Sequence, residues 1–375
     1  MLLAALLALA AAAAVVPRYA RAAGLVILAA GVDGWPHRLA SAGAGAFRVE
    51  ERTVPGRTGA LRGRLYLPSG RPRRALLLAP GVHAAGLDEP RLGDFAGHLA
   101  SRGYAVLAVE LPDLVRYHVT ARTADMIEDA AVWLAGASGL AADGRVGVAG
   151  ISFAGGLAVV AAGRPALRDR VAFVLSVGGY GDLPRTLRYL CTGALADGTV
   201  RAPHDYGLAI VLLALAGAVA PAEQAEALRD GILTFLEASQ TDAVDKARAA
   251  SLFERAREKE RALPEPAATL LGLVNRRRVA DLGRILLPHL DGVATDPALS
   301  PERSPAPAAP VFLLHGAADN VIPSLESRLL ARHLEGKVHV ELLVSASLTH
   351  AEARPAGSLR EAWKMVGFWA SLLDQ

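Results

Sequence analysis

Residues 148–156 read VAGISFAGG, an apolar run that ends at a single hydroxyl, Ser152, among residues with very small side chains. The apolar residues before Ser152 are typical of a buried strand, and the small apolar residues after it predict a helix over 154–162. A serine in such a turn often does no more than satisfy neighbouring backbone groups. The alternative is a nucleophile that a strained turn raises above the end of the strand.

Short apolar runs alternate with amphipathic patterns on both sides of this stretch, which is typical of a parallel sheet covered by helices. The predicted strands are residues 61–67, 75–79, 105–111, 145–151, 171–177, 311–314 and 338–344. The predicted helices among them are residues 91–102, 123–134, 154–162, 325–334 and 359–373. The sequence therefore predicts an α/β fold, with a mostly parallel central sheet flanked by helices.

The alternation stops between residues 184 and 309. Helical patterns follow one another there, at residues 207–218, 222–238, 242–263 and 267–287. A sheet domain that is interrupted by helices explains this order better than two consecutive domains do. We therefore predict a sheet domain in two parts, residues 46–183 and 310–375, with a helical cap inserted at 184–309.

The N-terminus is the most apolar part of the chain, because residues 1–16 carry no charged side chain. A helix of that length spans about 24 Å, which is less than the ~30 Å hydrocarbon core of a bilayer. No basic region precedes the apolar run, which disfavours a cleaved signal peptide. We predict that residues 1–45 form a membrane anchor and linker, either as one hydrophobic helix or as a hairpin that bends at Arg18 and Arg21. The two alternatives place the rest of the chain on opposite sides of the membrane, so the side stays open.

The composition limits the partners of the chain. Its charge is nearly balanced, at +3 for 375 residues, and the arginines are scattered rather than gathered in a stripe with aromatic residues. We therefore expect no nucleic acid as a partner. No spacing of His, Cys, Asp and Glu is typical of a metal site, and we expect neither a metal nor a cofactor. The single Cys191 excludes an internal disulfide, and we expect it to be a small buried residue.

A second chemical candidate lies in the stretch LHGAADNVIP, residues 314–323. A predicted strand ends near His315, and the loop after it presents Asp319 before the next helix. A buried aspartate in this place would hold an imidazole in the correct tautomer and stabilise its protonated form. The alternative is an aspartate that caps a turn or the following helix.

The third candidate is His350, in the loop between the last predicted strand and the final helix. Taken alone, a loop histidine is most often a surface residue. However, Ser152, Asp319 and His350 each follow the C-terminal end of a predicted strand. This shared placement favours a catalytic triad over three unrelated loop residues.

These features resemble the α/β-hydrolase superfamily over residues 47–373. The resemblance rests on the GISFA turn around Ser152, on the chain order Ser, Asp, His and on the stretch LHGAADNVIP. The sequence departs from the G-x-S-x-G motif at Ala154. The turn is similar to that of dienelactone-hydrolase-like members, which commonly carry cysteine where this chain has Ser152. The resemblance implies an α/β-hydrolase fold with a helical cap after the strand that follows the nucleophile.

The same resemblance implies a serine hydrolase that cleaves a carboxylic ester, lactone or thioester through an acyl-enzyme. Ser152 would be the nucleophile, His350 would act as general base and then as general acid, and Asp319 would orient the imidazole. A small-molecule ester is the expected substrate, and the apolar residues 208–215 of the predicted cap favour an apolar one. The alternative function is a catalytically silent binding or scaffolding module at the membrane. The sequence assigns no oligomeric state.

The expected oxyanion hole lies in the stretch LLLAPGV, residues 76–82, which is similar to the strand and oxyanion loop of the superfamily. The backbone N–H groups of Val82 and Phe153 are the expected donors. His83, directly after this stretch, either lines the pocket or is an ordinary loop residue.

Overall fold

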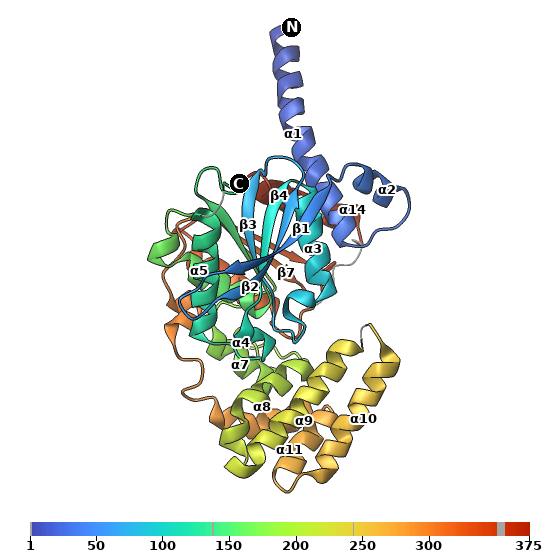
Figure 1. Cartoon of the computed structure of the whole chain (residues 1–375), viewed down its shortest axis with the longest axis vertical. Helices are drawn as coiled ribbons and strands as arrows, with labels where there is room; N and C mark the ends of the chain where they lie inside the picture. The colour runs from blue at the N-terminus through green and yellow to red at the C-terminus, as the bar shows by residue number, and fades with distance from the viewer. Residues whose placement is uncertain (1, 137–138, 243, 351–356) are drawn as a thin grey trace.

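An eight-stranded sheet forms the centre of the molecule (Figure 1). The computed structural model describes residues 2–136, 139–242, 244–350 and 357–375. In spatial order the strands are β1 (Phe47–Val54), β2 (Leu61–Pro68), β4 (Tyr104–Val109), β3 (Arg74–Ala79), β5 (Val146–Ile151), β6 (Val171–Val177), β7 (Val311–Gly316) and β8 (Val340–Ser345). β2 is antiparallel to both of its neighbours, and all other pairs are parallel. The prediction of a mostly parallel sheet is confirmed.

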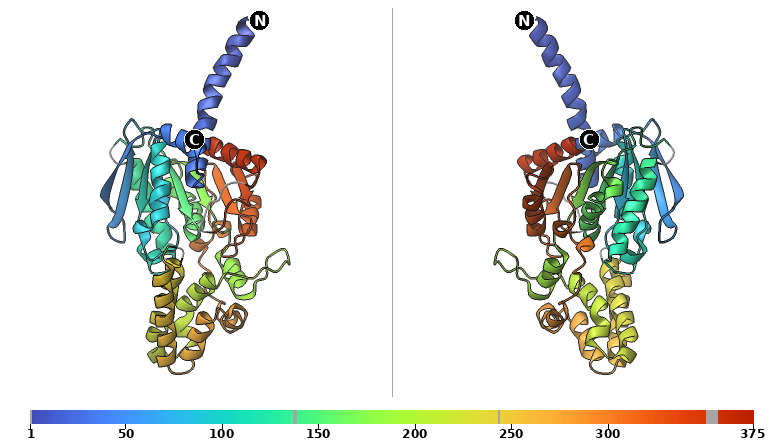
Figure 2. Two further views of the ribbon diagram at one scale, coloured as in Figure 1. Left: turned by 90° about the vertical axis from the view of Figure 1, so that its right-hand side faces the viewer. Right: turned by 90° about the vertical axis from the view of Figure 1, so that its left-hand side faces the viewer.

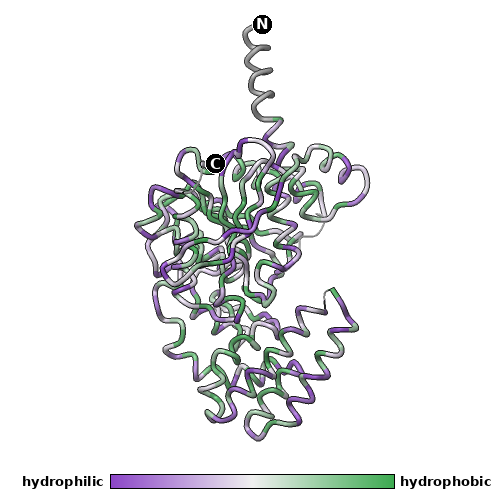
Figure 3. Tube along the Cα trace, in the orientation of Figure 1, coloured by the Kyte–Doolittle hydropathy of each residue, from purple (hydrophilic) through white to green (hydrophobic). Residues whose placement is uncertain are grey.

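Helices cover both faces of this sheet, because parallel strands need crossover connections. The helices α3 (Pro90–Ser101) and α14 (Leu359–Leu372) pack on one face. The helices α5 (Ala121–Gly136), α6 (Phe153–Ala162) and α13 (Ser324–Leu334) pack on the other. Every residue of β4 is buried, and Figure 3 shows apolar residues along the central strands. Burial on both faces explains why these strands are continuous apolar runs in the sequence.

Between β6 and β7 the chain forms helices, and we call residues 184–309 the helical segment. Its main helices are α7 (Leu183–Thr192), α8 (Asp205–Val219), α9 (Ala222–Thr241), α10 (Lys246–Ala262), α11 (Ala267–Asn275) and α12 (Val279–Leu286). Most of the segment lies beyond one end of the sheet in all views (Figures 1 and 2). The single helix predicted over 267–287 is wrong, because the chain breaks at Arg277, which has a φ of 53°. Cys191 on α7 is buried as expected, and burial raises the pKa of its thiol to about 12.

Two elements before β2 are absent from the sequence prediction. β1 reads FRVEERTV and is largely exposed, so it lacks the apolar run that marks the other strands. The helix α2 (Trp35–Ala42) lies in the second part of residues 1–45, where we expected a linker after the anchor. The rest of that linker is held to the body of the molecule. The guanidinium of Arg102 donates to the carbonyl of Gly43, and the N–H of Gly45 donates to the carbonyl of Ser101.

The N-terminal residues form one helix, α1 (Leu2–Ala29), with Pro17 inside it. This arrangement agrees with the single-helix alternative and not with the hairpin. α1 projects from the body of the molecule (Figure 1). Within the described part of the chain, no helix has the length and apolar character needed to cross a membrane. The membrane anchor therefore stays a prediction.

Candidate active site

Ser152 lies in a sharp turn between β5 and α6. Its backbone has a φ of 57° and a ψ of −130°, a conformation that non-glycine residues rarely adopt. The turn is possible because Gly150 has no side chain: a Cβ there would lie 2.1 Å from the carbonyl oxygen of Ala154. Gly155 is equally constrained, since its Cβ would meet the hydroxyl of Ser176 at 2.6 Å. Ala154 itself is fully buried, and its methyl group is accommodated.

His350 connects the hydroxyl of Ser152 to the carboxylate of Asp319. The Oγ atom of Ser152 lies 3.0 Å from Nε2 of His350, and Nδ1 of His350 lies 2.8 Å from Oδ2 of Asp319. A carboxylate only accepts, so Nδ1 carries the proton and Nε2 is free to accept the proton of the Ser152 hydroxyl. The three residues are far apart in the sequence and come together because each follows the C-terminal end of a parallel strand, β5, β7 or β8.

Asp319 also stabilises the loop in which it lies. Its Oδ1 atom accepts hydrogen bonds from the N–H groups of Val321 and Ile322, at 2.9 and 3.0 Å. The two alternatives for Asp319 are therefore both realised, because one carboxylate oxygen caps the turn and the other binds His350. Burial alone would raise the pKa of Asp319, but the charge of His350 and hydrogen bonds from His315 and His350 outweigh it. The net pKa is below the ordinary value, so the carboxylate is ionised at neutral pH.

His315 is a residue of this site that the sequence analysis overlooked. It is fully buried at the end of β7, and its Nε2 atom lies 2.8 Å from the carbonyl of Ile322 and 3.4 Å from Oδ2 of Asp319. A carbonyl only accepts, so Nε2 carries a proton, and Nδ1 lies 2.7 Å from the hydroxyl of Ser327, which itself lies 3.4 Å from the carbonyl of Gly179. The signal for this role was a histidine near the end of a strand, four residues before the acid, but the sequence does not show which groups its two ring nitrogens contact.

The loop after β3 lies directly beside Ser152. A Cβ added to Gly81 would lie 3.2 Å from the Cβ of Ser152, which shows how closely the two backbones approach. The N–H of Phe153 opens α6 and has no acceptor inside that helix. Among the described residues, the N–H of Val82 also donates to no acceptor. Both N–H groups expected to form an oxyanion hole are therefore near Ser152. That of Phe153 follows Ser152 in the chain, and that of Val82 follows Gly81 in the neighbouring loop.

His83 takes part in the local structure of the same loop. Its Nδ1 atom accepts the N–H of Ala85 at 3.1 Å, and the side chain is half-buried. Burial lowers the pKa of His83, so the imidazole is neutral at pH 7. This agrees with an ordinary loop residue, and nothing in the geometry links the ring to Ser152 or His350.

Side chains from the helical segment hold both loops of the site, and no sequence pattern identified these side chains. The guanidinium of Arg201 donates to the carbonyls of Ala317 and Asp319, at 3.2 and 3.1 Å. On the other side, the hydroxyl of Tyr206, on α8, donates to the carbonyl of Val82 at 3.2 Å. The side-chain amide of Gln240, on α9, donates to that hydroxyl at 2.7 Å. These contacts join the helical segment to the acid loop and to the loop after β3.

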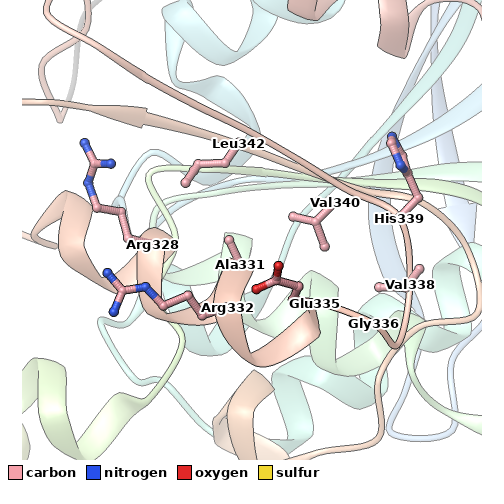
Figure 4. Close-up of a pocket in the computed structure, with 9 residues that line it drawn as sticks. All are labelled: Arg328, Ala331, Arg332, Glu335, Gly336, Val338, His339, Val340 and Leu342. Carbon is pink, nitrogen blue, oxygen red and sulfur yellow. The ribbon is translucent and has the colours of Figure 1, made fainter.

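A hollow on the surface lies elsewhere, along the outer edge of the sheet (Figure 4). Its lining residues are Arg328, Ala331, Arg332, Glu335, Gly336, Val338, His339, Val340 and Leu342. These belong to α13, to the connection after it and to the N-terminal half of β8, whereas His350 follows the C-terminal end of β8. The hollow therefore has no part in the geometry around Ser152. The described residues also contain no group of three or more His, Cys, Asp or Glu side chains that could hold a metal ion.

Comparison with known proteins finds likeness only among solved structures. No protein-family model matches the chain, and no curated protein matches it in sequence. An esterase from Pyrobaculum calidifontis is 19% identical, with a TM-score of 0.45, and the match covers 88% of this chain and 86% of that one. A Klebsiella pneumoniae protein described as a dienelactone hydrolase is 14% identical, with a TM-score of 0.44 and coverages of 87% and 99%. At these values the matches assign no activity or substrate to this chain.

A third match, the acylaminoacyl peptidase of Pyrococcus horikoshii, is 14% identical with a TM-score of 0.47. It covers 88% of this chain but 41% of the peptidase. The fold of this chain follows instead from its own features: the strand order, the antiparallel β2 and the strained strand–helix turn at Ser152. These features show that the chain has the α/β-hydrolase fold, the fold of the superfamily that its sequence resembles.

Proposed function

We propose that the protein is a serine hydrolase that cleaves a carboxylic ester, lactone or thioester through an acyl-enzyme. The observation that carries this proposal is the pair of contacts at His350, 3.0 Å to Ser152 and 2.8 Å to Asp319. A serine hydroxyl is a weak nucleophile until a positioned base takes its proton. The strained turn at Ser152 supports the same role, since backbone strain collects at functional sites.

In the proposed reaction, Oγ of Ser152 attacks the carbonyl carbon of the substrate while Nε2 of His350 takes the hydroxyl proton. Asp319 holds Nδ1–H and stabilises the imidazolium that forms. The N–H groups of Val82 and Phe153 stabilise the negative oxygen of the tetrahedral intermediate. His350 then gives its proton to the leaving alcohol or thiol, and the acyl group stays on Ser152. Water, deprotonated by His350, releases the acid and restores the serine.

We assign the helical segment the role of a cap over this site. The contacts of Arg201 with the acid loop and of Tyr206 with the loop after β3 support this assignment, because they fix the segment against both sides of Ser152. α8 is apolar along most of its length, and this composition supports a small, apolar ester as the proposed substrate class.

The proposal includes attachment to a membrane through the N-terminal residues 1–16, which carry no charge. One apolar segment of this length gives at most surface attachment or a short insertion. The side of the membrane on which the hydrolase lies is not part of the proposal.

The test is Ser152→Ala in the full chain, assayed on short p-nitrophenyl esters and by labelling with a fluorophosphonate probe. Loss of the nucleophile should lower kcat by more than about 1,000-fold and abolish labelling. Ser69→Ala is the control, because its hydroxyl lies at an exposed turn and binds only the carbonyl of Ala46. Unchanged hydrolysis by the Ser152 variant would disprove the proposal. A wild-type protein that neither hydrolyses esters nor takes the label would favour the alternative, a silent binding module.

A further inference from the structure

Large apolar side chains are exposed around the place where α1 joins the body of the molecule. Trp35 and Leu39 of α2 are 70% and 66% exposed, and Leu359 and Trp363 of α14 are 91% and 66% exposed. Val16, on α1, is 62% exposed. α1, α2 and α14 lie together at the end of the molecule opposite the helical segment (Figures 1 and 2). We call these five residues the collar, and exposed apolar groups gathered in this way mark an interaction surface.

The collar has a fixed position relative to α1. The ring of Tyr19 stacks on Trp363 with centroids 5.5 Å apart and an angle of 5° between the rings. Ala22 and Leu25 are completely buried against the body of the molecule. Arg18 forms an ion pair with Asp374, at 2.9 Å, near the C-terminus of the chain. The second half of α1 is therefore part of the folded body, while the first half extends away from it.

Basic side chains accompany the collar. Arg38 follows Trp35 on α2, and Arg360 and Lys364 are neighbours of Leu359 and Trp363 on α14. All three basic residues are exposed, and none forms an ion pair with another described residue. The acids near them in the described sequence are Asp33, the partly exposed Glu361 and Asp374, of which Asp374 pairs with Arg18. The surface around α1 thus combines tryptophan and leucine side chains with free positive charges, the combination that binds at a lipid–water interface.

We propose that the collar docks on the headgroup region of an anionic lipid bilayer, with Arg38, Arg360 and Lys364 on the lipid phosphates and carboxylates. The uncharged first half of α1 then enters the acyl region. The proposal deepens the N-terminal attachment proposed above and is independent of the chemistry at Ser152. One weak apolar segment alone gives only marginal binding to a membrane. An apolar segment together with a second membrane-binding surface gives stable attachment.

This docking fixes the direction in which the active site faces. The collar and the helical segment occupy opposite ends of the molecule (Figure 2). Ser152 follows the end of β5 on the side of the helical segment, so the proposed docking places Ser152 at the end of the sheet that is away from the bilayer.

The first test measures binding of the full-length protein to vesicles of phosphatidylcholine with and without phosphatidylserine. Trp35→Ser and Trp363→Ser should each weaken binding by about tenfold, because each removes a large buried apolar surface at the interface. Replacing Arg38 or Lys364 by Gln should weaken binding to the anionic vesicles by about fivefold, with little effect on neutral ones. Val244→Ser is the control, because Val244 is 81% exposed in the helical segment, far from the collar.

Quenching of tryptophan fluorescence by brominated lipids is an independent measurement of whether the collar contacts the bilayer. Trp35 and Trp363 should be quenched by lipids brominated near the headgroup, and Trp369→Phe should leave the quenching unchanged because Trp369 is buried. Binding and quenching that the collar variants do not alter would overturn the proposal. Self-association that Trp35→Ser abolishes would overturn it in favour of a second copy of the chain.

A separate variant distinguishes the collar from the proposed N-terminal attachment. Leu9→Arg places a charge among residues 1–16 and leaves the five residues of the collar unchanged. If Leu9→Arg weakens vesicle binding and the collar variants do not, attachment holds and the collar proposal fails. The rate of hydrolysis of a soluble ester should stay within about twofold of the wild type in every collar variant. Membrane binding does not contribute to transition-state stabilisation when the substrate is in solution.

Discussion

At the scale of single residues, the geometry of the site depends on the hydrogen-bond partners of each polar atom, and Asp319 shows this most clearly. Both oxygens of Asp319 have partners: Oδ1 accepts two backbone N–H groups, and Oδ2 binds His350. His315 adds a proton near Oδ2 from a fully buried position. The carboxylate is therefore held in one orientation before any substrate binds, which lowers the cost of aligning His350.

Asp319→Asn should lower kcat by about 1,000- to 10,000-fold with little change in KM. The amide oxygen can still accept from Val321 and Ile322, so the loop should be preserved. The amide NH₂ then faces Nδ1 of His350 and favours the tautomer in which Nε2 carries the proton. That tautomer cannot accept the proton of Ser152. Steady-state kinetics on a p-nitrophenyl ester test the prediction, and a loss of less than about tenfold would contradict the orienting role.

The stability of the protein should depend on pH through the same residue. The pKa of Asp319 is lower in the folded protein than the ordinary value of about 4 in an unfolded chain. The unfolded state therefore takes up the proton first, so the stabilisation is complete above about pH 4 and is lost as the pH falls below it. The difference in free energy of unfolding between the wild type and Asp319→Asn should thus shrink toward acid pH. Urea unfolding at a series of pH values measures it, and a difference that is constant with pH would be evidence against the prediction.

Sequence reasoning reached some of these residues and not others, for physical reasons. Ser152, Asp319 and His350 were identifiable because each follows the end of a strand, which is a local pattern. His315 and Tyr206 were not, because their roles consist of contacts to a backbone carbonyl that only the folded chain brings near.

At the scale of elements, the helical segment and the sheet meet through a few hydrogen bonds around Ser152. Tyr206, on α8, donates to the carbonyl of Val82 and accepts from Gln240 on α9. This pair holds the carbonyl of Val82, the residue whose own N–H is a proposed oxyanion donor. Tyr206 therefore acts as a positioning residue, because it fixes Val82 without touching the reacting atoms.

Tyr206→Phe should lower kcat/KM by about fivefold, mostly through kcat, since one hydrogen bond is worth about 1 kcal/mol. The inhibition constant of a trifluoromethyl ketone, whose adduct carries the oxyanion, should rise by the same factor. Tyr104→Phe is the matched control, because its hydroxyl also donates to a carbonyl, that of Leu373, at the opposite end of β4. If Tyr206→Phe and Tyr104→Phe lose stability alike and neither changes kcat, the positioning role is wrong.

The helices and strands also show which elements sequence patterns can predict and which they cannot. Buried strands such as β4 were predicted because both of their faces are apolar. β1 was missed because its alternating charges resemble a loop, and only its pairing with β2 makes it a strand. The break between α11 and α12 follows from the left-handed conformation of Arg277, which no apolar pattern records.

At the scale of the whole molecule, two surfaces lie at opposite ends of one sheet. Parallel strands collect Ser152, Asp319 and His350 at the end where the helical segment packs. The other end carries α1, α2 and α14, with the exposed collar. The proposed chemistry and the proposed attachment therefore lie at separate ends, and variants at one end should leave the proposed function of the other intact.

The central claim is that an acyl group passes through Ser152. The most direct measurement mixes the full-length protein with a p-nitrophenyl ester, follows the release of p-nitrophenol on the millisecond scale, and quenches the reaction in acid for peptide mass spectrometry. We predict a burst of product equal to the amount of enzyme, with one acyl group on the peptide that contains Ser152. Turnover without an acylated Ser152 peptide, or with the acyl group on another residue, would contradict this account.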